Sequence, residues 1–292
     1  MRPTAGQAHS PRAAFSVRIN AVNVATRTFA LHELASAHAA AGFCRIHDPD
    51  ATDAPQSPDP RVWLKEGELE RHARFRVQHA RDDFLAGRIA TKSALAAIVP
   101  HTQPHAWEIV GGIWRQPCVR GPSAGLAVTL AHADGAAVAV AHDDRWTCGI
   151  DLERTTRDAA DVVRTQVSPA ESAWAEAAPG DASRWMLLWT AREAIGKAAR
   201  TGLLFPETLP ATRDWRQEPN GSWRAALGDS DLLSIVAVCS GEWTLSLLVP
   251  SADAGSSPMR ETLQWFADRL RETPPVVSAP VGSSRCATAV AP

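Results

Sequence analysis

The order of the elements in the sequence predicts an α+β fold built from two similar subdomains. Strand-like alternation near the N-terminus is followed by helical periodicity and then by short strands, and the same order returns in the second half. Turn-forming residues separate the short strands, which favours antiparallel pairing. Each subdomain is therefore expected to be a small antiparallel sheet packed with helices, and a site is expected between the two.

The first half begins with residues 15–22, which alternate as a strand does. Residues 31–43 are rich in alanine and are expected to form a short helix, and residues 48–60 a polar, proline-rich loop. Residues 67–99 then carry helical periodicity over a length that predicts two helices.

Short β-like segments follow at residues 106–110, 126–132, 136–142 and 146–153. Asp134 and Gly135 supply turn chemistry between the second and third of these segments, and Asp143 and Asp144 between the third and fourth. The last three segments are therefore expected to form an antiparallel meander.

The second half contains two helices with recognisable ends. Ser168 is the predicted N-cap of the first, with Pro169 at its first position and Glu171 completing a capping box. The second spans residues 181–202 and is expected to end at Gly202. Strands are predicted at residues 221–227, 232–238 and 243–249, and a short helix at 261–270.

These elements divide the chain into four regions. We expect a disordered tail at residues 1–12, an N-terminal subdomain at 13–143 and a C-terminal subdomain with the functional motifs at 144–250. Residues 251–292 are expected to be a tail that is partly helical or disordered.

Composition excludes several classes of protein. The formal net charge of −2 argues against a general nucleic-acid binder. No run of apolar residues is long enough for a transmembrane helix, and the N-terminal segment has no apolar signal core. The five cysteines are far apart and form no CxxC pair, which argues against a disulfide scaffold or a zinc site. We expect a cytoplasmic monomer that contacts neither membrane nor nucleic acid.

Two pairs of charged residues stand out. Asp151 and Glu153 lie two apart at the end of an apparently buried strand, so both side chains point to one face and repel unless a cation or a proton lies between them. Glu193 and Lys197 share one face of a helix at i and i+4. Taken alone, the first pair is also typical of a solvated strand end and the second of a surface ion pair.

Together the two pairs favour chemistry on a phosphate. Three carboxylates without a histidine or cysteine cluster indicate a hard cation, of which Mg²⁺ is the most plausible. Lys197 is one of three lysines among 30 basic residues, and it could place its charge on a phosphate. A metal, a cation and a carboxylate base suit attack at phosphorus.

The residues of these motifs resemble a known family. "GIDLE" (residues 149–153) followed by "WTAREAIGK" (189–197) is similar to the paired motifs of 4′-phosphopantetheinyl transferases. The resemblance is to the long, single-chain, two-subdomain class that serves polyketide and nonribosomal peptide synthetases. Residues 74–88 resemble the first helical segment of that class and residues 129–141 its strand–turn–strand, so the resemblance covers roughly residues 15–250.

The resemblance implies a pseudo-dimer of two similar halves with coenzyme A bound between them. It implies transfer of the phosphopantetheine arm to a serine of an apo acyl or peptidyl carrier protein, with Mg²⁺, releasing adenosine 3′,5′-bisphosphate. It assigns the metal to Asp151, Glu153 and Glu193, and catalysis to Glu193 as base and Lys197 as phosphate contact. It assigns coenzyme A to His132, Arg71, Lys197, Arg192 and Gln116.

The chain also departs from the family pattern. Ala131 and Ala133 flank His132 where hydroxyl residues are usual, which predicts missing phosphate hydrogen bonds. Arg192 replaces a lysine, and Arg115 replaces the glycine that precedes Gln116. These departures bear on coenzyme A affinity more than on the metal ligands.

Two other functions stay open on the sequence. One is a different Mg²⁺-dependent phosphotransferase or phosphodiesterase with a water nucleophile. The other is a catalytically silent relative that binds a carrier protein or nucleotide. The basic segment at residues 61–92 is either a solvated helix face or a surface with a phosphate-facing subset, namely Arg71, Arg81, Arg88 and Lys92.

Overall fold

The computed structural model describes residues 15–19, 22–32, 34, 37–46, 58–155, 159–202 and 208–272. The expected tail at residues 1–12, most of the expected loop at 48–60 and the last part of the expected C-terminal tail lie outside these ranges. The elements of the first half are β1 (Phe15–Ile19), β2 (Val22–Ala30), β3 (His38–Ile46), α1 (Pro60–Trp63), α2 (Glu66–Arg74), α3 (Gln78–Ile98), the 3₁₀ helix η1 (Pro104–Ala106), β4 (Glu108–Gly111), β5 (Pro117–Arg120), β6 (Leu126–Ala133) and β7 (Ala136–Asp143). Those of the second half are β8 (Gly149–Arg154), α4 (Ala159–Arg164), α5 (Pro169–Glu176), α6 (Ala182–Ala198), β9 (Thr212–Gln217), β10 (Trp223–Leu227), β11 (Ser230–Ser240), β12 (Trp243–Pro250), α7 (Ser251–Ala254) and α8 (Ser257–Arg271).

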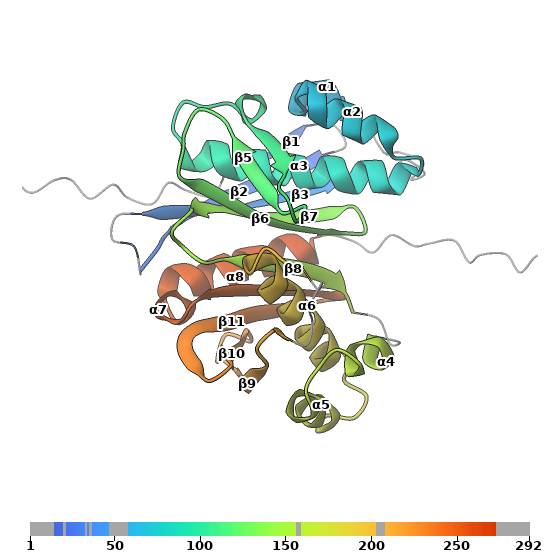
Figure 1. Ribbon diagram of the computed structural model, residues 1–292, viewed down its shortest axis with the longest axis vertical. Coiled ribbons are helices and arrows are strands. Elements are labelled where there is room, and N and C mark those ends of the chain that lie inside the picture. Colours follow the sequence, from blue (N-terminus) through green and yellow to red (C-terminus); the bar gives the residue numbers. More distant parts are fainter. Residues whose placement is uncertain are drawn as a thin grey trace, which may run out of the picture.

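The fold is α+β, with antiparallel sheets packed with helices. The first half contains the sheet β1-β2-β3-β7-β6 and the second the sheet β8-β12-β11-β10-β9, and β4 pairs with β5 in a separate hairpin. The two halves lie one above the other, with α1–α3 on the outer side of the first sheet and α4–α6 on the side of the second (Figure 1). The expected subdomain boundary, between residues 143 and 144, falls between β7 and β8, which belong to different sheets.

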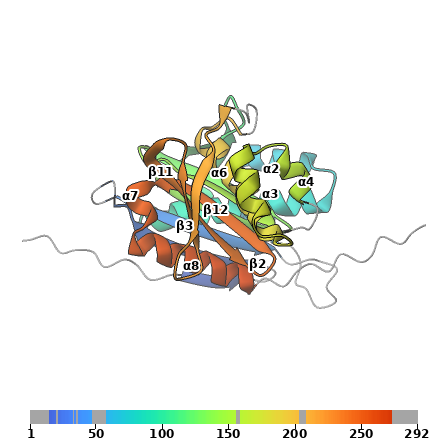
Figure 2. The same cartoon turned by 90° about the horizontal axis from the view of Figure 1, so that it is seen from below.

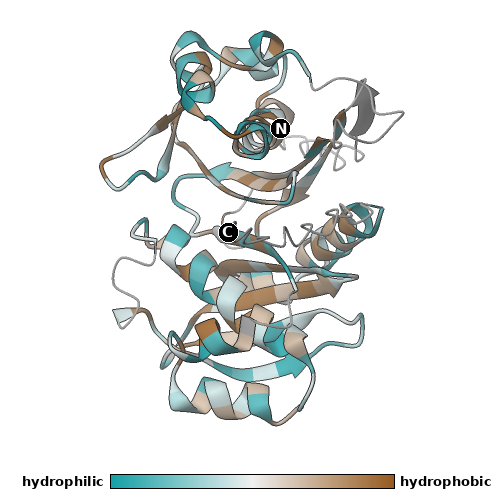
Figure 3. Cartoon of the chain, turned by 90° about the vertical axis from the view of Figure 1, so that its right-hand side faces the viewer, coloured by the Kyte–Doolittle hydropathy of each residue, from teal (hydrophilic) through white to brown (hydrophobic). Residues whose placement is uncertain are grey.

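One hydrophobic core joins the two halves. It takes Val138 and Val140 from β7, Ile150 and Leu152 from β8, and the inward residues of β11, β12 and α8. The strands on the two sides of this core carry many hydrophobic residues (Figure 3). Helix α8 strengthens this junction because it packs against β11 of the second half and β2 of the first (Figure 2). Among the described residues, no helix combines the length and the apolar character needed to cross a membrane.

The two halves repeat the same path of the chain. In each, a strand (β3 or β8) leads into helices, a two-stranded ladder follows (β4–β5 or β9–β10), and the last strand returns to pair antiparallel with the first (β7 with β3, β12 with β8). A glycine lies at the same place in each: a Cβ on Gly42 would lie 2.1 Å from the carbonyl oxygen of Ala90 in α3, and one on Gly149 would lie 1.9 Å from that of Ala194 in α6. Because glycine has no Cβ, the long helix of each half can approach its strand closely at these two positions.

The helix expected at residues 31–43 is wrong, because this segment leads into strand β3. Ala39, Ala40 and Ala41 are fully buried, and β3 pairs with β2 on one side and β7 on the other. Alanine has the highest helix propensity of all residues, but its advantage is below about 1 kcal/mol per residue, and tertiary packing overrides it here. Small residues are needed in this strand because α3 lies directly on it.

The expected meander of the last three segments is also wrong in part. Strands β6 and β7 form the predicted hairpin, with Asp134 and Gly135 both at positive φ in its turn. Strand β8, however, pairs with β12 in the other sheet. The reason is that Ile150 and Leu152 of β8 complete the core between the sheets, a partnership that local turn chemistry does not reveal.

Several local predictions are confirmed. Helices α2 and α3 occupy the segment expected to contain two helices, and Ser168 and Glu171 form the expected capping box of α5. Helix α6 ends earlier than expected, at Ala198, and Arg200 rather than Gly202 adopts the first left-handed conformation after it (φ 62°). Strands β2, β5 and β9 carried no recognised signal.

Candidate functional site

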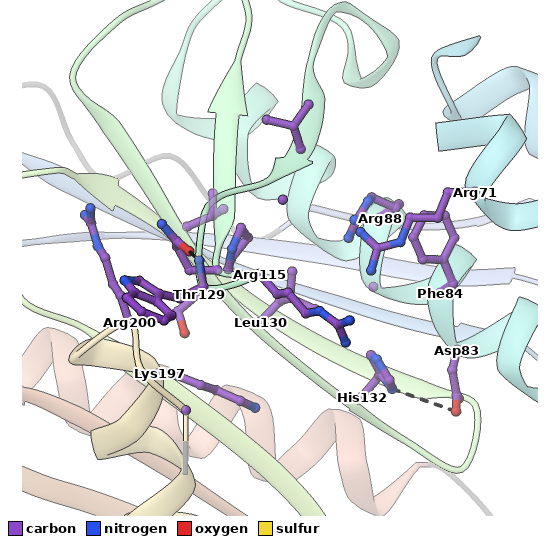
Figure 4. A pocket seen from close by; sticks show the side chains of 18 of the residues that line it. Arg71, Asp83, Phe84, Arg88, Arg115, Thr129, Leu130, His132, Lys197 and Arg200 are labelled. Carbon is purple, nitrogen blue, oxygen red and sulfur yellow. Dashed lines mark hydrogen bonds and ion pairs between the residues drawn. The ribbon is translucent and has the colours of Figure 1, made fainter. Parts of the chain in front are cut away.

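A pocket of about 430 Å³ lies where the two halves meet. Its walls come from α2, α3, β6 and the β4–β5 hairpin of the first half, and from the C-terminal end of α6 in the second. Figure 4 shows Lys197 and Arg200 entering from the second half, opposite Arg71, Arg88 and His132 from the first. The position agrees with the interface expected from the sequence.

The charge of this pocket suits a ligand with several negative groups. Its lining includes five residues with permanent cationic groups, and Asp83 is the one acidic side chain among the lining residues that the structure describes. The cationic residues are Arg71, Arg88, Arg115, Lys197 and Arg200. Burial lowers the pKa of Arg88 to about 10, against the opposing charge of Glu68, so Arg88 is still a cation at neutral pH. Cations separated by a few side chains repel one another, and a bound polyanion relieves that repulsion.

Lys197 connects the pocket to the strand that carries the predicted metal ligands. Its Nζ lies 2.6 Å from Oδ1 of Asp151, whose side chain is 6% exposed. The other oxygen of Asp151, Oδ2, is buried and has no hydrogen-bond donor. A buried carboxylate oxygen without a partner is costly, so this atom is a natural ligand for a cation.

Glu153 and Glu193 form an electrostatic group with Asp151. Burial and the charge of Asp151 raise the pKa of Glu153 to about 7, although the Trp189 indole donates a hydrogen bond to it. Burial and Asp151 likewise raise the pKa of Glu193, with Lys197 acting in the opposite direction. The structure therefore brings the predicted carboxylates close enough to repel one another, which a divalent cation would relieve.

The placement of these groups depends on how α6 lies on β8. The contact of Gly149 with the Ala194 carbonyl brings the middle of α6 onto the strand, two residues before Asp151. Thr190 also hydrogen-bonds Ser246 of the neighbouring strand β12, with 2.7 Å between the two hydroxyl oxygens. These contacts fix the helix face that carries Glu193 and Lys197 toward Asp151.

The donor set fits Mg²⁺ in chemistry. All the candidate ligands are carboxylates, and Asp151 offers a buried oxygen with no partner. Within the described part of the chain, no three histidine, cysteine or acidic side chains lie close enough together to hold a metal ion as they stand. Mg²⁺ commonly takes only one or two carboxylates and completes its shell with water and substrate phosphates, so an open arrangement suits it.

His132 lies in the pocket with one side to solvent. Its Nδ1 is 3.8 Å from Oδ2 of Asp83, which also lies 3.2 Å from Nε2 of His79 (Figure 4). Burial lowers the pKa of His132, Lys197 and Arg88 act in the same direction, and Asp83 opposes them. Because strand side chains alternate, Ala131 and Ala133 point the other way and pack in the core between the sheets. Hydroxyl side chains at positions 131 and 133 would therefore point away from the pocket wall that carries His132, so their absence does not change that wall.

Arg192 lies away from the pocket lining. Its side chain is 6% exposed, and Nη2 donates to Oε2 of Glu171 at 3.1 Å. The sequence-based assignment of Arg192 to coenzyme A is therefore not retained in our proposal. Of the basic subset on α2 and α3, Arg71 and Arg88 line the pocket, whereas Lys92 is buried against Glu68 and Arg81 donates to the Phe75 carbonyl.

The β4–β5 hairpin brings Gln116 and Arg115 to the pocket edge. Oε1 of Gln116 accepts from the Trp114 amide at 2.9 Å, and the Gln116 side chain packs against Gly112. Arg115 adopts φ 64°, the left-handed conformation that glycine would take without strain. Holding an arginine in this conformation costs roughly 1–2 kcal/mol.

The second-half part of this site lies within one recognised domain. Residues 147–245 match the family model of the 4′-phosphopantetheinyl transferase superfamily. This match identifies a domain of that superfamily in the second half of the chain. This domain contains Asp151, Glu153, Glu193 and Lys197, whereas His132, Arg71 and Gln116 lie before it. No curated protein matches the chain.

The phosphopantetheinyl transferase domain supplies only one wall of the pocket. Sequence reasoning missed Arg200, the pocket role of Asp83 and the hydrogen bond from Trp189 to Glu153. The sequence offered no signal for Arg200 or Asp83, since both depend on the packing of the two halves. Trp189 is the first residue of the motif at 189–197, but its hydrogen bond to Glu153 depends on how α6 lies on β8.

Proposed function

We propose that this protein transfers the 4′-phosphopantetheine arm of coenzyme A to a serine of an apo acyl or peptidyl carrier protein. The reaction forms a bond between the serine oxygen and the phosphorus that bears the pantetheine. The bond from that phosphorus to the bridging oxygen breaks, and adenosine 3′,5′-bisphosphate leaves. Synthases of polyketides or nonribosomal peptides are the proposed source of the carrier protein, and the proposed setting is the cytoplasm.

One observation carries the proposal: a cation-lined pocket at the junction of the halves meets the carboxylate group of a phosphopantetheinyl transferase domain at Lys197. Coenzyme A carries a pyrophosphate and a 3′-phosphate, and the pocket offers cations on both of its sides. We place the 3′-phosphate near His132, Arg71 and Arg88, and the pyrophosphate near Lys197.

The residues of this chain have distinct roles in the proposed reaction. Lys197 can release Asp151 and donate to the pyrophosphate, where its charge favours departure of the leaving group. Glu193 is the proposed base that takes the serine proton, and its raised pKa brings it closer to the range in which a carboxylate accepts a proton at neutral pH.

Asp151, Glu153 and Glu193 are the proposed holders of Mg²⁺. When bound there, Mg²⁺ would neutralise charge on the pyrophosphate. The Trp189 indole orients Glu153 toward this group through its hydrogen bond.

The test is an intact-mass assay with coenzyme A, Mg²⁺ and a panel of apo carrier proteins. The proposal expects each accepted carrier protein to gain the mass of one phosphopantetheine arm on its serine, with adenosine 3′,5′-bisphosphate formed in equal amount. Coenzyme A cleavage without mass gain would replace the proposal with a hydrolytic phosphodiesterase. Binding of coenzyme A without any turnover would instead indicate a silent relative.

A further inference from the structure

A fully buried carboxylate, Glu171, ties α6 to the rest of the second half. Its Oε1 accepts from the backbone N–H and the hydroxyl of Thr212, both at 2.7 Å. Its Oε2 accepts from the Ser168 amide at 2.8 Å and from Nη2 of Arg192 at 3.1 Å. Burial by itself would raise the pKa of Glu171, but these hydrogen bonds and the charge of Arg192 lower it, so the carboxylate is ionised. Glu171 therefore joins the start of α5, the strand β9 and the middle of α6.

The first half contains the same arrangement around Glu68. Oε2 of Glu68 accepts from the Lys65 amide at 3.0 Å and from Nζ of Lys92, and Oε1 accepts from the Ile109 amide at 3.1 Å. Nε of Arg88 lies 3.2 Å from Oε1. Glu68 and Glu171 thus each cap a short helix and accept a hydrogen bond from a later strand. Each also forms an ion pair with a basic side chain of the long helix of its half.

The repeat aligns the residues of the two halves. Gly42 and Ala90 correspond to Gly149 and Ala194 through their matching close contacts. Counting from these pairs, Asp151 and Glu153 correspond to Cys44 and Ile46 of β3, and Glu193 corresponds to Ile89 of α3. All three counterparts are buried in the apolar core under α3. Both halves therefore keep the buried carboxylate, whereas only the second half has acidic residues at these three positions.

We propose that Arg192 is a positioning residue, which acts through Glu171 to orient Glu193 toward Asp151 and Glu153. Arg192 directly precedes Glu193 on α6, so the two side chains leave the helix in different directions. An ion pair that holds Arg192 therefore fixes the rotation of α6 and with it the direction of Glu193. Gly149 and Ser246 hold the sheet side of α6, and neither restrains its outer side toward α5 and β9. On that side Arg184 donates to the Trp174 carbonyl near the start of α6, and the ion pair of Arg192 with Glu171 holds the part of the helix next to Glu193. This inference rests on the proposed function, because it concerns the metal and base of the same reaction.

The test compares Arg192→Met and Arg192→Lys with Lys92→Met, which removes a cation from Glu68, the corresponding carboxylate of the other half. Removing one partner of a buried ion pair destabilises the protein, so all three are first compared by thermal melting and assayed well below their melting temperatures. Two quantities are then measured: the dissociation constant of Mn²⁺, as a paramagnetic probe, in the presence of coenzyme A, and kcat and KM for coenzyme A.

We expect Arg192→Met to weaken Mn²⁺ binding and to lower kcat by roughly 10–100-fold each, the range typical when a group that orients a metal ligand is lost, with KM for coenzyme A nearly unchanged. Arg192→Lys keeps a cation beside Glu171, so this variant should retain most of the Mn²⁺ affinity and most of the kcat. Lys92→Met should leave Mn²⁺ binding unchanged, because its helix carries Ile89 where α6 carries Glu193.

Thr212→Val loosens the same carboxylate without leaving an unpaired charge, so the inference is testable even if Arg192→Met does not fold. It should weaken Mn²⁺ binding in the same direction, by a smaller factor. Unchanged Mn²⁺ affinity in folded Arg192→Met, or an equal loss in Lys92→Met, would overturn the inference. Failure of the wild-type protein to modify any carrier protein would count against the proposed function alone, since the Mn²⁺ measurement needs no carrier protein.

Discussion

Replacing Gly149 with alanine tests how the site is assembled. The added Cβ would lie 1.9 Å from the Ala194 carbonyl oxygen and 2.9 Å from the Ala198 nitrogen, both backbone atoms of α6. Real Cβ contacts are essentially never shorter than 3.0 Å, so α6 and β8 must separate by about 1 Å. Backbone atoms cannot move aside as a flexible side chain can, and the whole helix must shift.

The expected magnitude follows from the distances in the site. The contact of 2.6 Å between Lys197 and Asp151 would lengthen beyond ordinary hydrogen-bond range. A misplacement of about 1 Å in a catalytic group typically costs about 100-fold in rate. Overpacking a dense core also costs about 1–3 kcal/mol of unfolding free energy. We therefore expect Gly149→Ala to lower kcat by about 100-fold in a protein that still folds.

The assay is carrier-protein modification under initial-rate conditions, with melting followed by circular dichroism. Gly42→Ala is the matched control, because its Cβ would lie 2.1 Å from the Ala90 carbonyl oxygen in the other half. It should lose similar stability while keeping more of its kcat. Gly67→Ala has open space, with its nearest contact at 3.5 Å, and should be neutral or stabilising. A Gly149→Ala variant with the kcat of the wild-type protein would refute the reasoning.

Further substitutions test single parts of the site. Glu193→Ala and Asp151→Ala should each lower kcat by roughly 100-fold or more without unfolding the protein, as rates beside melting curves will show; wild-type rates would remove the proposed metal site. Arg115→Gly should raise unfolding free energy by roughly 1 kcal/mol in denaturant titrations, because it relieves a left-handed arginine, and should raise KM for coenzyme A by removing a cation. Burial lowers the pKa of His142 from 6.5, so the unfolded chain takes up a proton that the folded chain resists, and stability present above pH 6.5 is lost as pH falls. From about pH 7.5 to about pH 5.5 the melting temperature of the wild-type protein should therefore fall more than that of His142→Asn, and equal falls would contradict this assignment.

Local chemistry made some elements of both halves predictable. The capping box of α5 and the hairpin turn at Asp134 and Gly135 depend on neighbours in the sequence, and both occur where expected. The motif residues Asp151 and Lys197 were expected in one site, and the structure brings them into contact, although their roles stay a prediction.

Long-range packing decided the features that the sequence did not reveal. The alanines of β3 have high helix propensity, but Ala40 is buried against α3, and Ala39 and Ala41 are buried in the core between the sheets. Strand β8 follows β7 through a short connection, yet it joins the other sheet because Ile150 and Leu152 are needed in the shared core. Neither partner is visible from local periodicity.

Arg192 shows the same limit at a single residue. Its place in the motif next to Glu193 suggested a phosphate contact, but the side chain turns toward Glu171, 21 positions earlier in the chain. Glu171 was recognised only as part of a helix cap, and that role is confirmed. Its second role, as the partner of Arg192 and Thr212, requires the tertiary fold.

The central claim is that the cation-lined pocket and the carboxylates of β8 and α6 form one site for coenzyme A and Mg²⁺. A crystal structure with both bound tests this most directly. We predict the pyrophosphate against Lys197, the metal on Oδ2 of Asp151, and the 3′-phosphate between His132 and the arginines of α2 and α3. Coenzyme A bound elsewhere, or bound in the pocket with its pyrophosphate turned away from Asp151, would contradict the account.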